Sequence, residues 1–169
     1  MSLFTKSLVV TPYSDGKTWR LTEEFGYAIG SEGSSNTINV PAGFTTDFAS
    51  VPRLLWFFLP QWGKYGNAAV IHDYLYYIQT TSRTEADRIF LETMLVLDVP
   101  RWKRYCLYTG VRIGGWWSWL VNSRKKEQGY SKIVTAAPVK AVEQPGHWQT
   151  DLSELSTILQ GKKSDDSPK

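Results

Sequence analysis

Apolar residues recur at helical intervals in the middle of the chain. Residues 66–79 contain no proline, and their apolar side chains lie on one helical face; these are Val70, Ile71, Leu75 and Ile78. A second helix is predicted over about 84–97, with the Thr84 hydroxyl as its N-cap. The short turn over 79–83 makes an antiparallel pair the expected arrangement of these two helices.

The first fifty residues alternate apolar and polar side chains over much shorter stretches, which is typical of strands. Turn residues separate these stretches, and Pro12 is expected to end the first of them. Strands are predicted over 8–10, 18–22, 25–29 and 37–40.

A third helix, or a kinked pair, is predicted from Arg101 to Trp119, because Gly114-Gly115 interrupts the pattern. The basic run 124–126 is interpreted as a solvated helix end. The tryptophans 116, 117 and 119 are interpreted as core or subunit interface, with a membrane-interface role as the secondary alternative. From residue 128 to 169 the composition predicts an extended or partly disordered arm, with a short amphipathic helix over 151–160.

These elements predict one α+β domain over residues 1–127. It would be β-rich over 7–50 and helical over 62–122, with a small antiparallel sheet packed on two to three helices. An irregular C-terminal arm would follow.

Composition narrows the class of protein. The 169 residues are 42% hydrophobic and include eight tryptophans, as expected for a globular chain. A net charge of +3 gives no strong signal for nucleic-acid binding. Cys106 is the only cysteine, which excludes an intramolecular disulfide and a cysteine-based zinc cluster. We see no secretory signal and no run of the roughly 18 apolar residues that span a bilayer, so synthesis in a reducing cytoplasm is expected.

The candidate chemistry centres on His72, one of two histidines in the chain. Tyr76 follows four residues later and shares its helix face, whereas Asp73 is turned by about 100°. If the two helices are antiparallel, Asp87 returns beside the first helix and can hold the imidazole. A histidine held by a carboxylate is a competent general base.

Asp47 lies in a stretch of small and hydroxyl residues, 43–52, that suits a tight loop. It is interpreted either as a turn former or partner of Arg53, or as a further acidic group directed at the His72 cleft. The apolar run 54–59 that follows is interpreted as core, with a lipid- or partner-docking patch as the alternative.

Two resemblances add to this interpretation. The stretches 43–52, 69–76 and 86–90 together resemble an uncharacterised family found in tailed phages and prophages, over roughly residues 8 to 120. This resemblance implies a phage origin, with synthesis in the cytoplasm of the bacterial host. Incorporation into the virion is the alternative location.

The His72-Asp73-x-x-Tyr76 motif with the later Asp87 also resembles the paired helices of the secreted and parvoviral phospholipases A2. The resemblance implies that His72 is the general base, that Asp73 binds calcium, and that Tyr76 and Asp87 hold the histidine. The Gly-rich calcium loop of that family is not matched at its usual spacing, so its carbonyls would come from 43–50 or from the glycines 63 and 66. Asp47 is the second metal-binding candidate.

Three functions follow as hypotheses. The first is a calcium-dependent lipid hydrolase that acts on the host membrane. The second is a non-catalytic virion or tail-associated protein with a structural His–Asp pair, which contacts other virion proteins or itself through its aromatic surface and C-terminal arm. The third is a metal-dependent cell-wall hydrolase. Hydrolysis requires His72 and Asp87 within about 3 Å and a cavity beside them.

Overall fold

The computed structural model describes residues 2–30, 35–48 and 65–134. These residues belong to one compact unit. Arg53, the apolar run 54–59 and the predicted helix 151–160 lie outside the described residues.

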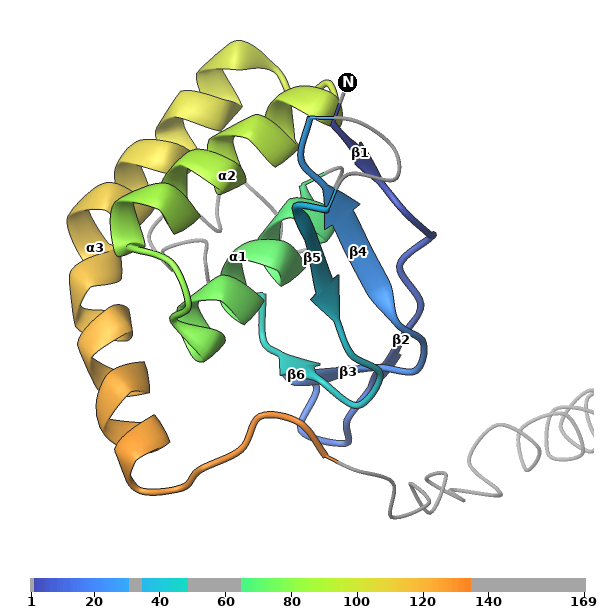
Figure 1. Ribbon diagram of the computed structural model, residues 1–169, viewed down its shortest axis with the longest axis vertical. Coiled ribbons are helices and arrows are strands. Elements are labelled where there is room, and N and C mark those ends of the chain that lie inside the picture. The colour runs from blue at the N-terminus through green and yellow to red at the C-terminus, as the bar shows by residue number, and fades with distance from the viewer. Residues whose placement is uncertain (1, 31–34, 49–64, 135–169) are drawn as a thin grey trace, which may run out of the picture. The chain divides into compact units, whose positions relative to one another are not determined.

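The described residues form six short strands in two antiparallel sheets (Figure 1). The first sheet has the order β1-β4-β5, with β1 at Leu3–Phe4, β4 at Phe25–Ala28 and β5 at Thr37–Val40. The second has the order β2-β3-β6, with β2 at Val10–Pro12, β3 at Trp19–Leu21 and β6 at Thr45–Thr46.

Each of the four predicted strands has a counterpart, although the one predicted over 8–10 overlaps β2 only at Val10. The strands divide between two sheets rather than forming one. β1 and β6 were not predicted, because two residues are too few to show an alternation. Pro12 lies inside β2 instead of ending the strand before it. It is tolerated there because β2 is an edge strand, where a missing N–H need not break the ladder.

Three helices follow within the described part of the chain: α1 (Gly66–Ile78), α2 (Arg83–Val96) and α3 (Arg101–Glu127). The first two agree with the predicted bounds to within one residue. The predicted cap was wrong, because Ser82 rather than Thr84 is the N-cap of α2, and its side chain accepts the Glu85 backbone N–H.

α3 passes through Gly114-Gly115 without a break, which corrects the prediction of a helix ending at residue 119 or of a kinked pair. Each helical glycine costs about 1 kcal/mol relative to alanine. The close approach of Tyr76 to Gly115 compensates, since no larger residue would leave room for that ring.

α1 lies at the centre of the unit, beside α2, α3 and β5 (Figure 1). Polar side chains of α3 donate hydrogen bonds to carbonyls at the C-terminal end of α1, where these carbonyls have no partner within their own helix. Asn122 donates to the Tyr76 carbonyl, and Lys126 donates to that of Ile78 at 2.7 Å. The long third helix is therefore fixed against the helix that carries His72.

After α3 the chain returns to β6. The backbone N–H of Thr45 donates to the Lys132 carbonyl at 2.9 Å, and that of Val134 donates to the Gly43 carbonyl at 3.0 Å. Gly43 has a φ of +87°, and a Cβ at this position would lie 2.5 Å from the Val134 oxygen. Glycine is therefore required where these two segments meet.

The described unit is an α+β domain, as predicted, with a core between the sheets and α1. None of the described helices combines the length and apolar character that crossing a bilayer requires.

Candidate active site

Asp87 is a fully buried carboxylate that joins all three helices. Its Oδ1 accepts hydrogen bonds from Tyr76 Oη at 2.7 Å and from His72 Nε2 at 3.0 Å. Its Oδ2 accepts from Arg112 Nη1 at 2.9 Å and from Arg83 Nη1 at 3.3 Å. Four donors from α1, α2 and α3 thus converge on one side chain, which satisfies both of its oxygens.

These contacts determine the ionisation of Asp87. Burial by itself would raise its pKa, but the hydrogen bonds from His72, Tyr76 and Arg112 outweigh burial and hold the pKa below its usual value. Burial and the bond to Asp87 raise the pKa of Tyr76, so its hydroxyl remains a donor. The contact with Asp87 also raises the pKa of Arg112.

The His72 ring is fixed by its hydrogen bond to Asp87 and by contact with two aromatic rings. Because Asp87 is ionised, Nε2 carries the proton that it donates, and a neutral His72 ring therefore accepts at Nδ1. The ring lies against Tyr76 and Phe90, with centroid distances of 4.2 Å and 4.7 Å. This packing fixes the plane of the imidazole.

A cavity of about 480 Å³ lies beside this histidine, which is 2% exposed. Four of the candidate residues line it: Asp47, His72, Asp73 and Tyr76. Asp87 does not line it and contacts His72 from the side. The structure therefore brings the five sequence-predicted residues to one place, although their chemical roles remain predictions.

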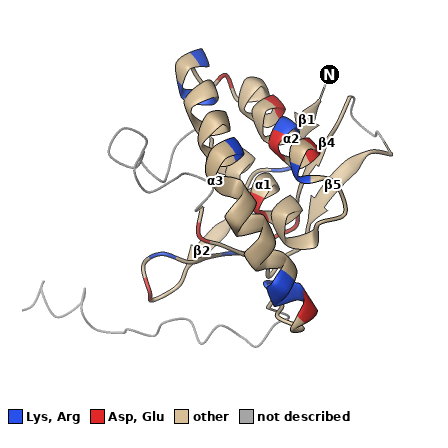
Figure 2. Ribbon diagram, turned by 90° about the vertical axis from the view of Figure 1, so that its left-hand side faces the viewer, with Lys and Arg blue, Asp and Glu red and all other residues tan. Residues whose placement is uncertain are grey.

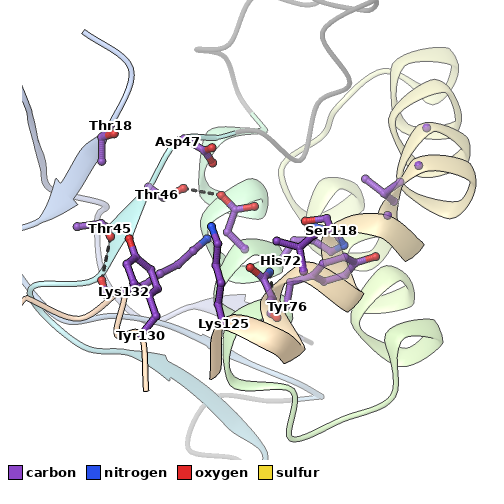
Figure 3. A pocket seen from close by; sticks show the side chains of 17 residues that line it. Thr18, Thr45, Thr46, Asp47, His72, Tyr76, Ser118, Lys125, Tyr130 and Lys132 are labelled. Atoms are coloured by element: carbon purple, nitrogen blue, oxygen red, sulfur yellow. Dashed lines mark hydrogen bonds between the residues drawn. The ribbon is translucent and has the colours of Figure 1, made fainter. Parts of the chain in front are cut away.

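Further lining comes from segments distant in sequence, as Figure 3 shows for Lys125 and Lys132, whose side chains reach into the space between β6 and α1. Ser118, Asn122 and Lys125 come from α3, while Tyr130 and Lys132 follow it. The Lys125 ammonium lies 5.4 Å from the centre of the Tyr130 ring. The cavity therefore contains both cationic and acidic side chains.

Asp73 is buried, and its Oδ2 accepts a hydrogen bond from the Thr46 hydroxyl. The nearby arginines of α2 pair elsewhere, Arg83 with Asp87 and Arg88 with Glu85. Within the described ranges, no group of three or more His, Cys, Asp or Glu side chains is placed to hold a metal ion. Calcium binding at Asp73 and Asp47 remains a prediction.

Sequence reasoning missed four cationic side chains at this site. Arg83 had a detectable signal, because it precedes Asp87 by four residues on one helix. Arg112, Lys125 and Lys132 had none, since they reach the site only through the packing of α3 and the segment after it. The run 124–126 was interpreted simply as a solvated helix end, yet Lys125 lines the cavity.

Gly115→Ala is expected to destabilise the protein by about 1–3 kcal/mol, the usual cost of overpacking. A Cβ at residue 115 would lie 2.5 Å from Tyr76 Oη. The Tyr76 ring cannot yield easily, because it packs on His72 and Trp119 and bonds Asp87. Denaturant unfolding measures the change.

Gly114→Ala is the matched control, because a Cβ there meets nothing within 4 Å. It should be neutral or should stabilise the helix by up to about 1 kcal/mol. Equal stability of the two variants would contradict the close Tyr76–Gly115 contact.

Residues 19–111 match the family described as "Protein of unknown function (DUF1353)". The match covers more than half of the chain and includes His72, Asp73, Tyr76 and Asp87, so the chain belongs to this family. It is also 34% identical over 119 residues to the uncharacterized protein y4iH of Sinorhizobium fredii. That alignment covers 67% of this chain and 50% of the relative, so the chain spans about half the length of that protein. No solved structure matches the chain.

Proposed function

We propose that this protein is a small phage-encoded hydrolase with a phospholipase A2-like His–Asp site, which cleaves ester bonds of host-membrane phospholipids. The observation that carries the proposal is the contact of His72 Nε2 with Asp87, at 3.0 Å, beside a cavity that His72 lines. Buried His–carboxylate pairs also occur as structural elements, but such a pair needs no cavity of about 480 Å³ next to it.

In the proposed reaction His72 acts as the general base. The neutral imidazole takes a proton from a water molecule, whose oxygen attacks the ester carbonyl carbon to form a tetrahedral intermediate. The intermediate collapses, the ester C–O bond breaks, and the leaving alkoxide receives the proton from the imidazolium. The products are a fatty acid and a lysophospholipid. Asp87 keeps the proton on Nε2 and stabilises the charged ring, while Tyr76 holds Asp87.

The cavity offers groups suited to a phospholipid. Lys125 and Lys132 supply the positive charge that a phosphodiester requires, and hydroxyl groups of β6 and α3 supply hydrogen bonds. When bound, calcium would polarise the ester carbonyl. Asp73 and Asp47 are the described carboxylates that line the cavity and would hold it.

The second candidate is a non-catalytic virion or tail-associated component. The saturation of Asp87 by four donors favours it, since such a hub stabilises a three-helix arrangement whether or not any reaction occurs. In this case His72 would serve only as one of the four donors.

The test is direct incubation of the purified protein with phospholipid vesicles, with calcium or with a chelator, and mass-spectrometric detection of products. We expect equal amounts of free fatty acid and lysophospholipid. A water-soluble short-chain phospholipid, supplied in parallel, reports the chemistry without a need for membrane contact. If neither substrate is cleaved in either condition, the hydrolase proposal is wrong and the structural candidate replaces it.

Calcium is tested separately by thermal unfolding of the wild type and of Asp73→Asn. A ligand that binds only the folded state raises its melting temperature by mass action. Calcium should stabilise the wild type and not the variant. Equal behaviour of the two proteins would remove Asp73 from the metal site.

A further inference from the structure

α3 exposes a row of large apolar side chains to solvent. These residues, here called the aromatic stripe, are Trp102, Tyr105, Ile113, Trp116, Trp117 and Leu120, and they are 45% to 71% exposed. At 100° per residue all of them lie within about 60° of one line along the helix. Contiguous exposed apolar patches of this kind are typical of binding surfaces, whereas single exposed apolar residues are common on any protein surface.

The charge of α3 suits one kind of partner. The helix has seven basic residues and one acidic residue, a balance of +6, whereas the whole chain has 19 basic and 16 acidic residues and a balance of +3. The rest of the chain is therefore net negative, with 12 basic and 15 acidic residues. Lys and Arg gather toward the two ends of α3 (Figure 2), and in the sequence Arg112 lies between these ends.

Indole and phenol rings with flanking Lys and Arg are the side chains that bind the interface of an anionic membrane. The rings enter the headgroup region, and the cations contribute about 1 kcal/mol each near an anionic surface. A second copy of this chain fits less well, because packing one α3 against another would bring two positively charged helices together.

The stripe also borders the cavity. Trp117 shares its helix face with Gly114 and Val121, which line the cavity, at spacings of three and four residues. Tyr130, another cavity residue, is 56% exposed. A lipid surface in contact with the stripe would therefore lie next to the cavity that His72 lines.

We propose that the aromatic stripe of α3 docks the protein onto an anionic phospholipid surface and presents the cavity to it. This inference deepens the proposed function, on which its biological purpose rests, but the docking itself requires no hydrolysis. α3 would lie parallel to the surface, with Arg101, Lys103 and Arg124 contacting acidic headgroups.

The experiment is co-sedimentation with vesicles of pure phosphatidylcholine and of phosphatidylcholine with phosphatidylglycerol. The protein should bind the anionic vesicles more tightly, and added salt should weaken that binding. The double variant Trp116→Gln/Trp117→Gln should bind about tenfold more weakly or worse. Ile113→Gln, at the most exposed position of the stripe, serves as a second variant that removes no aromatic packing.

Leu95→Gln/Val96→Gln is the matched control, because these residues are also exposed but lie at the end of α2. It should bind vesicles as the wild type does. The proposal is overturned if the wild type does not bind anionic vesicles, or if stripe and control variants bind equally. It is also overturned if sedimentation velocity shows self-association that the stripe variants abolish while vesicle binding is absent.

Hydrolysis of the water-soluble phospholipid separates this inference from the proposed function. The stripe variants should cleave that substrate at the wild-type rate, while losing vesicle binding. Vesicle binding without any hydrolysis would contradict the proposed function only. Vesicle hydrolysis that is insensitive to the stripe variants would contradict the docking surface only.

Discussion

His72→Gln should reduce phospholipid hydrolysis by a factor of about 10² to 10⁴, the usual contribution of a general base. The glutamine amide can still donate a hydrogen bond toward Asp87, but it cannot accept a proton from water. The rate of fatty-acid release from vesicles measures the loss, and thermal unfolding verifies that the variant is folded.

His147→Gln is the control for this variant, because it removes the only other histidine of the chain. It should leave the rate unchanged. If the folded His72→Gln protein hydrolyses phospholipid at the wild-type rate, another group is the base and the assigned mechanism is wrong.

Asp87→Asn should destabilise the fold by about 3–5 kcal/mol, as expected when one partner of a buried charged network is removed. Asparagine has nearly the same shape, but its amide nitrogen would face hydrogen-bond donors in place of one carboxylate oxygen. His72 and Tyr76 donate to one oxygen, and two arginines donate to the other. Denaturant unfolding at neutral pH measures the effect.

The control is Glu85→Gln, which disrupts an ion pair with Arg88 on the same helix. Both side chains of that pair are well exposed, so the loss should stay below about 1 kcal/mol. Similar losses for the two variants would show that Asp87 does not join the helices as its contacts indicate.

The pH dependence of stability provides a second test of the role of Asp87, with the Asp87→Asn variant as the comparison. The folded-state pKa of Asp87 is lowered, so its contribution is present above the unfolded-state pKa of about 3.9 and is lost as pH falls through the folded-state value. The difference in unfolding free energy between wild type and variant should therefore be largest at neutral pH and should decrease below about pH 4. A difference that stays constant in acid would contradict an ionised Asp87.

The two helical stretches show what local pattern determines. The apolar spacing over 66–79 and the short turn after it predicted the antiparallel helices, and this geometry brings Asp87 to His72. Helical and strand periodicities depend on residues a few positions apart, so they are visible in a single sequence. The same reasoning found four strands and the α+β class.

Short elements and glycine-containing helices escaped the same reasoning. β1 and β6 are each two residues long and exist through pairing with distant strands. The continuity of α3 through Gly114-Gly115 depends on the Tyr76 ring that packs against it. A local propensity cannot report either effect, because the stabilising partner is elsewhere in the chain.

By itself the sequence determined which helix carries His72 and Tyr76, and which carboxylate returns to them. The tertiary structure alone decided the rest of the site: Arg112 on the far oxygen of Asp87, the Gly115 gap that admits Tyr76, and the lysines of the cavity. It also decided that the face of α3 with Trp102 and Trp117 points to solvent. The physical reason is separation along the chain, since Arg112 and Lys132 reach the site only after α3 and the segment behind it have packed against α1 and β6.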